Sequence, residues 1–378
     1  MARWPQLDRR VIYIGAEHIL SPLGSTARTN FAQARKGESG ITPNHSHPNY
    51  TEKPISYIEN FQPTKGYSKI ESMAIFSVLD SLNQINVDTY TDNWLFILST
   101  TKGDIEHLAT GDIEKAKPSY LVSRIAEKLP VQTETMVVSN ACISGLVGAI
   151  TAHDYIATNK YDHVIVVGVD VVSKFTSSGF ESFFALSDEP SAPFDKDRKG
   201  LSLGEAVSTV VLSSNKEIFA ETPMQFSGGA SANDANHISG PSRTGEGLKR
   251  AIDSAMKFAE VSSTEIKHIS AHGTGTRYND DMESIAFNRC GLGNVPLNSL
   301  KGYFGHTLGA AGVVELSMTI QSMRNGEMLK TLGCENPGTT DEVNVLLENQ
   351  KGDLQTVLKT ASGFGGCNAA AILKKVSE

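Results

Sequence analysis

The chain has 378 residues, of which 39% are hydrophobic and 20% are charged, and its formal net charge is -8. This composition is typical of a globular protein and excludes a disordered or fibrous one. The acidic balance argues against a nucleic-acid-binding protein, because such proteins neutralise phosphate groups with lysine and arginine.

The sequence carries no pattern of a membrane span or of a secretion signal. Its densest apolar stretch, residues 164–172, is interrupted by Gly168 and Asp170 and is too short to cross a bilayer. Residues 1–10 lack the apolar core and the cleavage site of a signal peptide. We therefore expect a cytoplasmic protein without a membrane span.

The four cysteines, Cys142, Cys290, Cys334 and Cys367, are too few and too scattered for a disulfide framework. No Cys-x-x-Cys pair points to a zinc site. We expect no metal, and a reactive role rather than a structural one for any cysteine of special importance.

In chain order, short apolar runs alternate with segments of helical periodicity. Strands are expected at residues 11–15, 94–99, 135–139, 163–169, 206–212, 265–271, 356–362 and 369–374. Helices are expected at residues 69–83, 120–128, 245–260, 281–289 and 312–324, and loops at 42–53, 187–200 and 227–244. Nearly continuous apolar strands separated by helices predict α/β halves with a parallel or mixed sheet covered on both faces.

Cys142 stands where a predicted strand gives way to a helix of small and apolar residues, within residues 136–150. A thiol at a helix N-terminus feels the positive end of the helix dipole and unpaired amides, which favour the thiolate. Nucleophiles are displayed on such turns. A small buried cysteine without a reactive role explains the local pattern equally well.

Two further turns carry histidines. His272 ends the strand at residues 265–271, at the place where open α/β sheets bind their ligands. Lys301 and His306 share the next glycine-rich segment, which leads into a helix. A buried Lys301 needs a carboxylate partner, and we expect that partner to be Glu283. A histidine of the core and an exposed lysine are the alternatives.

A third turn, residues 362–368, is rich in glycine and contains Phe364. Its backbone N–H groups could stabilise an oxyanion, and Phe364 could act as a mobile plug. A purely structural tight turn explains the glycines as well.

Taken together, these motifs resemble those of the β-ketoacyl synthases of fatty-acid and polyketide synthesis, in the elongating Cys-His-His class. Each motif alone is weak, but the ordered set is specific and covers almost the whole chain. The set comprises residues 20–24, 141–142, 193–198, 204–206, 271–276, 279–280, 301, 305–306, 309–312 and 363–366.

The resemblance implies a duplicated thiolase-like α/β fold, layered α-β-α-β-α. Residues 1–215 would form the half that carries the nucleophile, and residues 216–378 the half that carries the histidines. A homodimer is implied, or a heterodimer with a related ketosynthase-like subunit. The resemblance also implies an acyl carrier protein as partner, with phosphopantetheine delivered on that carrier and no tightly bound cofactor.

The implied reaction is a decarboxylative Claisen condensation that yields a β-ketoacyl-carrier protein, in fatty-acid, polyene or polyketide synthesis. Cys142 would accept the acyl group, with the amides of Cys142 and Phe364 as the oxyanion hole. His272 and His306 would support the decarboxylation of malonyl-carrier protein.

The resemblance places Lys301 among the catalytic residues, with Cys142, His272 and His306, and assigns supporting roles to Glu283, Phe364, Thr274 and Thr276. Lys301 would hold the catalytic network in register through Glu283. Thr274 and Thr276 would line the malonyl side of the site, and Phe364 would gate acyl entry.

The chain departs from the family pattern at several places. Residues 40–67 form a shorter region than expected, and residues 168–170 depart from the usual run of small residues. Ile143 follows the nucleophile where a smaller residue is common, which would narrow the acyl channel. Cys367 stands where the family has threonine.

Two other functions remain open at this point. A non-catalytic chain-length-factor-like partner subunit would typically lack the nucleophile. A coenzyme A thiolase would place a second cysteine before a glycine run near the C-terminus, whereas Cys367 follows its glycines.

Overall fold

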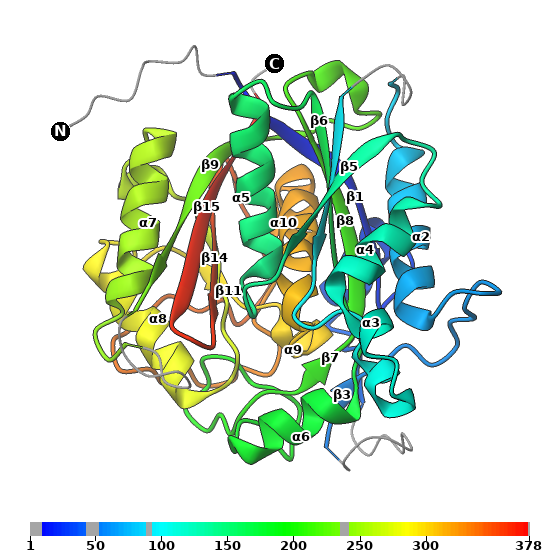
Figure 1. Ribbon diagram of the computed structural model, residues 1–378. Helices are drawn as coiled ribbons and strands as arrows, with labels where there is room; N and C mark the ends of the chain where they lie inside the picture. The colour runs from blue at the N-terminus through cyan, green and yellow to red at the C-terminus, as the bar shows by residue number, and fades with distance from the viewer. Residues whose placement is uncertain (1–9, 43–52, 88–92, 235–241, 377–378) are drawn as a thin grey trace.

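The computed structural model describes residues 10–42, 53–87, 93–234 and 242–376 (Figure 1). Its central feature is a ten-stranded sheet in the order β11-β10-β14-β15-β9-β1-β8-β6-β4-β5. These strands are β1 (Tyr13–Leu20), β4 (Trp94–Ser99), β5 (Thr133–Val138), β6 (His163–Asp170), β8 (Ala206–Ser213), β9 (Met224–Asn233), β10 (His268–Ser270), β11 (Leu297–Asn298), β14 (Thr356–Gly363) and β15 (Cys367–Lys375). Short strands lie outside it: β2 (Ile41–Thr42), β3 (Ile55–Ser56), β7 (Leu203–Gly204), β12 (Glu327–Met328) and β13 (Gln350–Lys351).

The large sheet consists of two halves with the same strand order. In chain order, one half consists of β1, β4, β5, β6 and β8, and the other of β9, β10, β11, β14 and β15. In each half, the first strand pairs antiparallel with the last, and the last pairs antiparallel with the fourth. The fourth, second and third strands then run parallel. Strands β1 and β9 join the halves through antiparallel pairing at Tyr13 and Ile14. This repeated order agrees with the duplicated fold implied by the sequence, while the boundary between residues 215 and 216 stays a prediction.

Helices complete a five-layer α-β-α-β-α arrangement (Figure 1). Helices α5 and α10 form the middle layer between the two halves of the sheet, α7 covers the outer face of one half, and α2 and α4 cover the outer face of the other. The helices are α1 (Ala27–Arg35), α2 (Lys69–Leu82), α3 (Ile113–Ala116), α4 (Pro118–Ala126), α5 (Ser144–Ala157), α6 (Lys174–Ser182), α7 (Glu246–Ala259), α8 (Arg277–Arg289), α9 (Lys301–Phe304) and α10 (Ala311–Asn325). Among the described residues, no helix has the length and apolar character needed to cross a membrane.

The structure confirms the predicted strand at 94–99 and the predicted helix at 69–83 to within one residue, but the predicted loop at 227–244 is partly wrong. Residues 227–233 belong to β9. Gly228 has a φ of 96°, and a Cβ on Gly229 would lie 2.5 Å from the Ala370 carbonyl oxygen. These glycines therefore allow an irregular and close pairing of β9 with β15, and they do not mark a turn. The predicted loop at 42–53 lies mostly outside the described residues.

The middle layer depends on glycines that bring α5 and α10 into backbone contact. A Cβ on Gly312 would lie 2.3 Å from the backbone nitrogen of Leu146, and one on Gly145 would lie 2.8 Å from that of Val313. Because real Cβ atoms do not approach backbone so closely, neither position accepts a side chain without movement of a helix. This close packing sets the distance between the N-terminal ends of the two central helices.

We predict that Gly312→Ala lowers the free energy of unfolding by about 1–3 kcal/mol, because the added methyl group overpacks the α5–α10 contact. Denaturant titration measures this loss. Gly179→Ala in α6 is the matched control, since its Cβ would meet no atom within 4 Å. We expect this control to gain about 0.5–1 kcal/mol from helix propensity. Equal stability of Gly312→Ala and the native chain would contradict the packing argument.

Candidate active site

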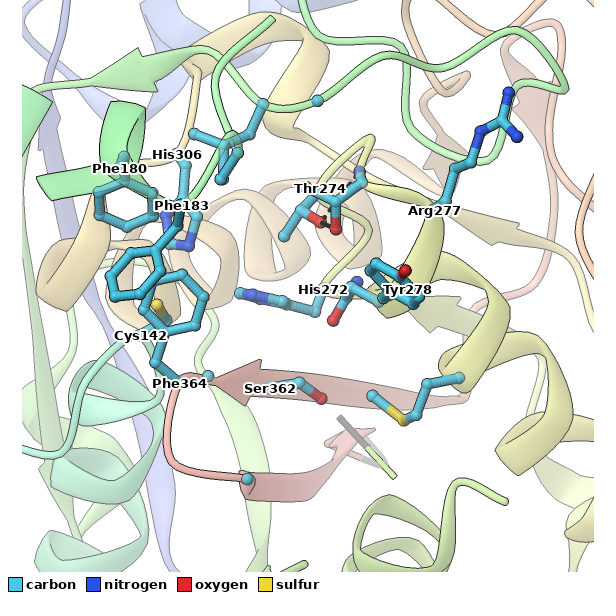
Figure 2. Close-up of a pocket in the computed structure, with 18 of the residues that line it drawn as sticks. Cys142, Phe180, Phe183, His272, Thr274, Arg277, Tyr278, His306, Ser362 and Phe364 are labelled. Carbon is cyan, nitrogen blue, oxygen red and sulfur yellow. Dashed lines mark hydrogen bonds between the residues drawn. The ribbon is translucent and has the colours of Figure 1, made fainter. Parts of the chain in front are cut away.

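The candidate active site is a pocket of about 920 Å³ (Figure 2). Cys142, His272, His306 and Phe364 line it. Cys142 comes from the turn between β5 and α5, His272 directly follows β10, and Phe364 lies between β14 and β15. His306 lies between α9 and a short 3-10 helix, Leu308–Ala310. Both halves of the chain therefore contribute to one pocket, and the predicted nucleophile and histidines are brought together.

Cys142 lies on a tight turn held in an unusual backbone conformation. Ala141 has a φ of 44°, in the left-handed region that residues with side chains rarely adopt. The Ser144 hydroxyl closes the turn, because it donates to the Ala141 carbonyl oxygen at 2.6 Å and accepts from the Asn140 N–H at 2.8 Å. The predicted strand-turn-helix setting of Cys142 is therefore present.

Burial controls the acidity of the Cys142 thiol. The side chain is 6% exposed, and burial raises the pKa of Cys142 to about 12, with a smaller contribution from Cys367. The Lys301 charge and the Phe364 backbone N–H, which donates to the thiol, lower the pKa but do not offset the burial. In the free protein, desolvation of the anion therefore outweighs the nearby groups that favour the thiolate.

Lys301 is the buried ion-pair partner of Glu315, and the expected pairing with Glu283 is wrong. The Lys301 Nζ lies 2.6 Å from Glu315 Oε1, with both side chains under 5% exposed. The same ammonium donates to His272 Nδ1 at 3.1 Å and to the His272 carbonyl oxygen at 2.6 Å. Glu315 meets Lys301 because α10 passes through the middle layer directly beside α9.

Glu283 holds the backbone of the histidine turn instead. Its carboxylate accepts the N–H groups of His272 at 2.9 Å and Gly273 at 2.6 Å, and the Asn279 side-chain amide at 2.9 Å. Burial raises the pKa of Glu283 to about 7, and the nearby Asp280 carboxylate adds to the effect. Glu283 therefore holds the backbone of His272 in position, while Lys301 holds the orientation of its ring.

The two histidines are neutral and share one tautomer. An ammonium group only donates, so the Lys301 contact makes His272 Nδ1 an acceptor. The Leu308 N–H donates to His306 Nδ1 at 3.0 Å, which makes that atom an acceptor too. Burial, with the positive charge of Lys301, lowers the pKa of both rings well below the ordinary value. Each ring therefore carries its proton on Nε2.

This tautomer leaves two N–H donors for a ligand in the pocket. The rings of His272 and His306 lie edge to face, with centroids 5.3 Å apart, next to Cys142 (Figure 2). Two preorganised donors in a buried site are suited to stabilise negative charge on a ligand oxygen. The site can thus combine a thiol nucleophile with an oxyanion-stabilising pair.

Aromatic side chains cover the thiol (Figure 2). The Phe364 ring stacks on Phe180 with centroids 5.2 Å apart and contacts Phe183 at 5.6 Å. Phe364 is still 37% exposed, and it is followed by Gly365 and Gly366 at positive φ. Phe180 and Phe183 were missed by the sequence analysis. Their segment has no motif, and only the fold brings it over the pocket.

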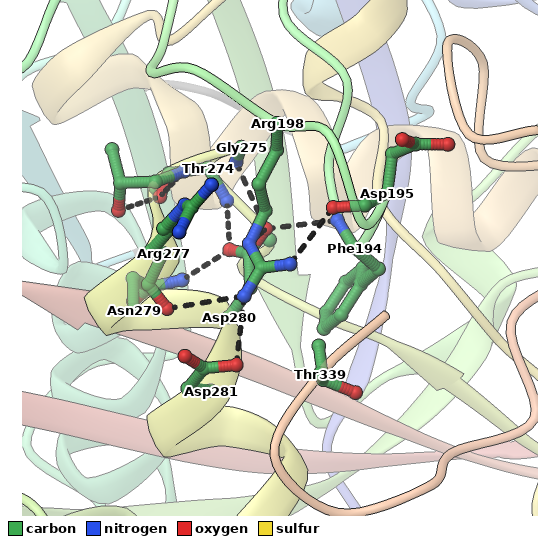
Figure 3. A network of polar contacts seen from close by, with 12 residues as sticks. Phe194, Asp195, Arg198, Thr274, Gly275, Arg277, Asn279, Asp280, Asp281 and Thr339 are labelled. Atoms are coloured by element: carbon green, nitrogen blue, oxygen red, sulfur yellow. Dashed lines mark hydrogen bonds and ion pairs between the residues drawn. The ribbon is translucent and has the colours of Figure 1, made fainter. Parts of the chain in front are cut away.

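A polar network supports the turn that holds Thr274 and Thr276, whose hydroxyls lie 2.8 Å apart on the pocket wall (Figure 3). Asp280 accepts the backbone N–H of Thr274 at 2.9 Å and that of Gly275 at 3.1 Å. Arg198 lies beside Asp280 and donates to Asp281 at 2.7 Å. The two threonines are therefore fixed on the pocket wall.

The described part of the chain contains no group of three or more His, Cys, Asp or Glu residues able to hold a metal ion.

Ile143, which was expected to narrow the acyl channel, is fully buried in the core with Leu146 and Val313. Its effect on chain length stays a prediction.

We predict that alkylation of Cys142 by iodoacetamide accelerates about tenfold per pH unit between pH 7 and pH 10, because only the thiolate reacts. The pKa of about 12 lies above this range, so the thiolate fraction keeps rising with pH. Peptide mass spectrometry follows Cys142 separately from the other cysteines. A rate that levels off below pH 9 would mean that the pKa is much lower than the buried site implies.

Comparison with known proteins places the chain in a family. The model "Beta-ketoacyl synthase, N-terminal domain" matches residues 93–217, and "Beta-ketoacyl synthase, C-terminal domain" matches residues 225–335. The 3-oxoacyl-[acyl-carrier-protein] synthase 2 of Vibrio harveyi is 26% identical over 414 residues, covering 98% of this chain and 99% of the relative.

Another relative is the tetracenomycin polyketide synthase ketoacyl synthase alpha subunit of Streptomyces glaucescens. It is 32% identical over 278 residues, covering 69% of this chain and 65% of the relative. The solved ishigamide ketosynthase/chain length factor superposes with a TM-score of 0.85 at 25% identity, covering 98% of this chain and 100% of that one. The two matched models together span more than half of the sequence, and the chain belongs to the β-ketoacyl synthase family.

Proposed function

We propose that this chain condenses an acyl group on Cys142 with malonyl-carrier protein and releases a β-ketoacyl-carrier protein. The observation that carries the proposal is the shared tautomer of His272 and His306, whose Nε2–H donors belong to the pocket that contains the thiol. A site for acyl transfer alone needs a nucleophile and one oxyanion hole, whereas condensation also needs donors for an enolate oxygen.

In the first half-reaction, Cys142 Sγ attacks the thioester carbonyl of an acyl-carrier protein. A new carbon–sulfur bond forms to Cys142, the bond to the carrier sulfur breaks, and the thiol proton passes to the departing carrier thiolate, which leaves as the thiol. The backbone N–H groups of Cys142 and Phe364 form the oxyanion hole of this step. The contact between the Phe364 N–H and the thiol supports the assignment.

In the second half-reaction, malonyl-carrier protein occupies the same pocket and loses CO2. The electron pair of the broken carbon–carbon bond moves into an enolate, whose oxygen accepts from the Nε2–H groups of His272 and His306. The enolate carbon attacks the acyl carbonyl, a carbon–carbon bond forms, and the Cys142 sulfur leaves as a thiolate that takes a proton from solvent. Donors fixed before the charge develops lower the barrier of this step.

The remaining residues position or admit the substrates. Lys301 orients the His272 ring, and Glu315 replaces Glu283 as the partner that holds Lys301. Thr274 and Thr276 line the malonyl side, opposite the histidines. Phe364 gates acyl entry, and its 37% exposure and the open space beside Gly365 leave the turn room to move.

The partner in both half-reactions is an acyl carrier protein, and the phosphopantetheine arrives on that carrier with no cofactor held tightly by the enzyme. The protein is proposed to act in the cytoplasm as a homodimer or in a heterodimer with a related subunit. Strand β5 supports dimerisation, because it forms one edge of the large sheet and pairs only with β4 among the described residues. An unpaired edge strand is open to pairing with a second chain.

Two alternatives are less consistent with the site. A non-catalytic chain-length-factor-like subunit has no need of a buried thiol beside two oriented imidazoles. A coenzyme A thiolase requires a second cysteine facing the substrate, whereas Cys367 lies in β15 and does not line the described pocket.

We predict that Cys142→Ala abolishes acylation by acyl-carrier proteins, because the attacking sulfur is gone. Intact-protein mass spectrometry with a panel of acyl chain lengths measures the adduct and shows the preferred chain. Cys334→Ala is the matched control, since this buried cysteine lies outside the pocket. The absence of an adduct on the native chain with every carrier tested would sink the proposed function.

We predict that His306→Ala retains acylation of Cys142 but slows condensation about 10²–10³-fold, because one donor to the enolate oxygen is lost. The two half-reactions are followed separately by mass spectrometry of the enzyme and of the carrier product. Loss of acylation in this variant would instead place His306 in the first half-reaction.

A further inference from the structure

Lys359 is a fully buried lysine that the proposed mechanism leaves without a role. It lies in the middle of β14, opposite Ser270 of β10 and Ala371 of β15, and is 0% exposed. Burial of an ammonium group is unfavourable unless the group is paired and hydrogen-bonded. A lysine at this position of a central strand therefore needs an explanation beyond the fold.

The Lys359 ammonium has three close oxygen partners. It donates to the Thr360 carbonyl oxygen at 2.5 Å and to the Ser270 carbonyl oxygen at 3.1 Å. It also lies 2.7 Å from Glu315 Oε2. Lys359 thus shares the Glu315 carboxylate with Lys301, one lysine on each oxygen.

This sharing connects Lys359 to a catalytic ring. Glu315 Oε1 accepts from Lys301, and Lys301 contacts Nδ1 of His272. Among the described residues, Lys359 is the polar partner of Glu315 Oε2, at 2.7 Å, so this ion pair restrains that oxygen. Because the terminal torsion of a glutamate is soft, loss of this restraint lets the carboxylate turn and Lys301 move with it.

Charge also links Lys359 to the His272 ring. Lys301 and Lys359 lie on the two oxygens of the Glu315 carboxylate, and a second buried carboxylate, Glu283, accepts the His272 backbone N–H. Burial comes first among the causes that lower the pKa of His272, and the charges of Lys301 and Lys359 add to it. The Lys301 ammonium, which contacts Nδ1 of the ring, strengthens the Nε2–H as a donor to a developing anion.

We propose that Lys359 is a positioning residue for the decarboxylation half-reaction, acting through Glu315 and Lys301 on the ring of His272. The inference rests on the proposed function, since it assigns a role within the second half-reaction. The alternative is a purely structural role, in which the ammonium only links β14 to β10 through backbone carbonyls. The experiment must distinguish this role from the positioning role.

The test uses Lys359→Met, which keeps the length of the side chain and removes its charge. We expect acylation of Cys142 to stay within about twofold of the native rate, and kcat for decarboxylation of malonyl-carrier protein to fall about 100-fold at unchanged KM, because a displaced catalytic group costs about that much. Lys359→Gln keeps amide donors for the backbone carbonyls and is expected to show the same loss. Lys374→Met, in β15 outside the pocket, is the control for loss of a lysine from the sheet.

A double-mutant cycle with Glu315→Gln decides between the two roles. If Lys359 acts through Glu315, adding Lys359→Met to Glu315→Gln causes no further loss of decarboxylation. Additive losses, equal slowing of both half-reactions, or a native rate in Lys359→Gln would overturn the inference and leave the proposed function intact. A native enzyme that forms no acyl adduct and releases no CO2 would overturn the proposed function and the inference together.

Discussion

The carboxylate of Glu315 lies in the dry middle layer of the molecule, where it binds one lysine with each oxygen. A single carboxylate there is stable only because the ammonium groups of Lys301 and Lys359 reach it from α9 and β14. The arrangement fixes the Lys301 ammonium against His272 Nδ1 and so decides which nitrogen of that ring faces the pocket. The charged groups that orient the His272 ring therefore lie in the middle layer, behind the residues that line the pocket.

The packing of α5 against α10 makes this arrangement possible. Glycines at the contact allow the two helices to touch through their backbones. As a result, the turn with Cys142, at the start of α5, and the segment with His306, just before α10, lie close together although they are 164 residues apart in the chain. The repeated strand order of the two halves places the two helices as counterparts in one layer. One half supplies the sulfur and the other supplies the imidazoles.

Much of this arrangement was predictable from the sequence, and the exceptions have physical causes. Strands with continuous apolar runs, such as β4, were found because burial on both faces leaves a clear pattern. Strand β9 was missed because its glycines signal a turn locally, while its partner β15 makes it a strand. Cys142, His272, His306 and Phe364 were found because each stands in or beside a turn of small residues, whereas the segment of Phe180 and Phe183 has no such motif.

The partner of Lys301 was assigned wrongly for a different reason. Glu283 and Glu315 both lie on helices that follow strands of the second half, and the spacing along the chain does not distinguish them. A usable signal was present, because Glu315 and Lys359 are the single charged residues of two uncharged, mostly apolar runs, at residues 312–316 and 357–361. When each of two buried segments carries one charge, and the charges are opposite, the two tend to form an ion pair, since an unpaired buried charge is unstable.

The aromatic cover over Cys142 bears on how long an intermediate can survive. A thioester on this sulfur would lie under the stacked rings of Phe180 and Phe364, at a position that is only 6% exposed. Hydrolysis needs a water molecule beside the carbonyl carbon, and apolar rings stacked beside the sulfur reduce the access of water to it. The enzyme would therefore be able to keep its first substrate intact while one carrier departs and the next arrives.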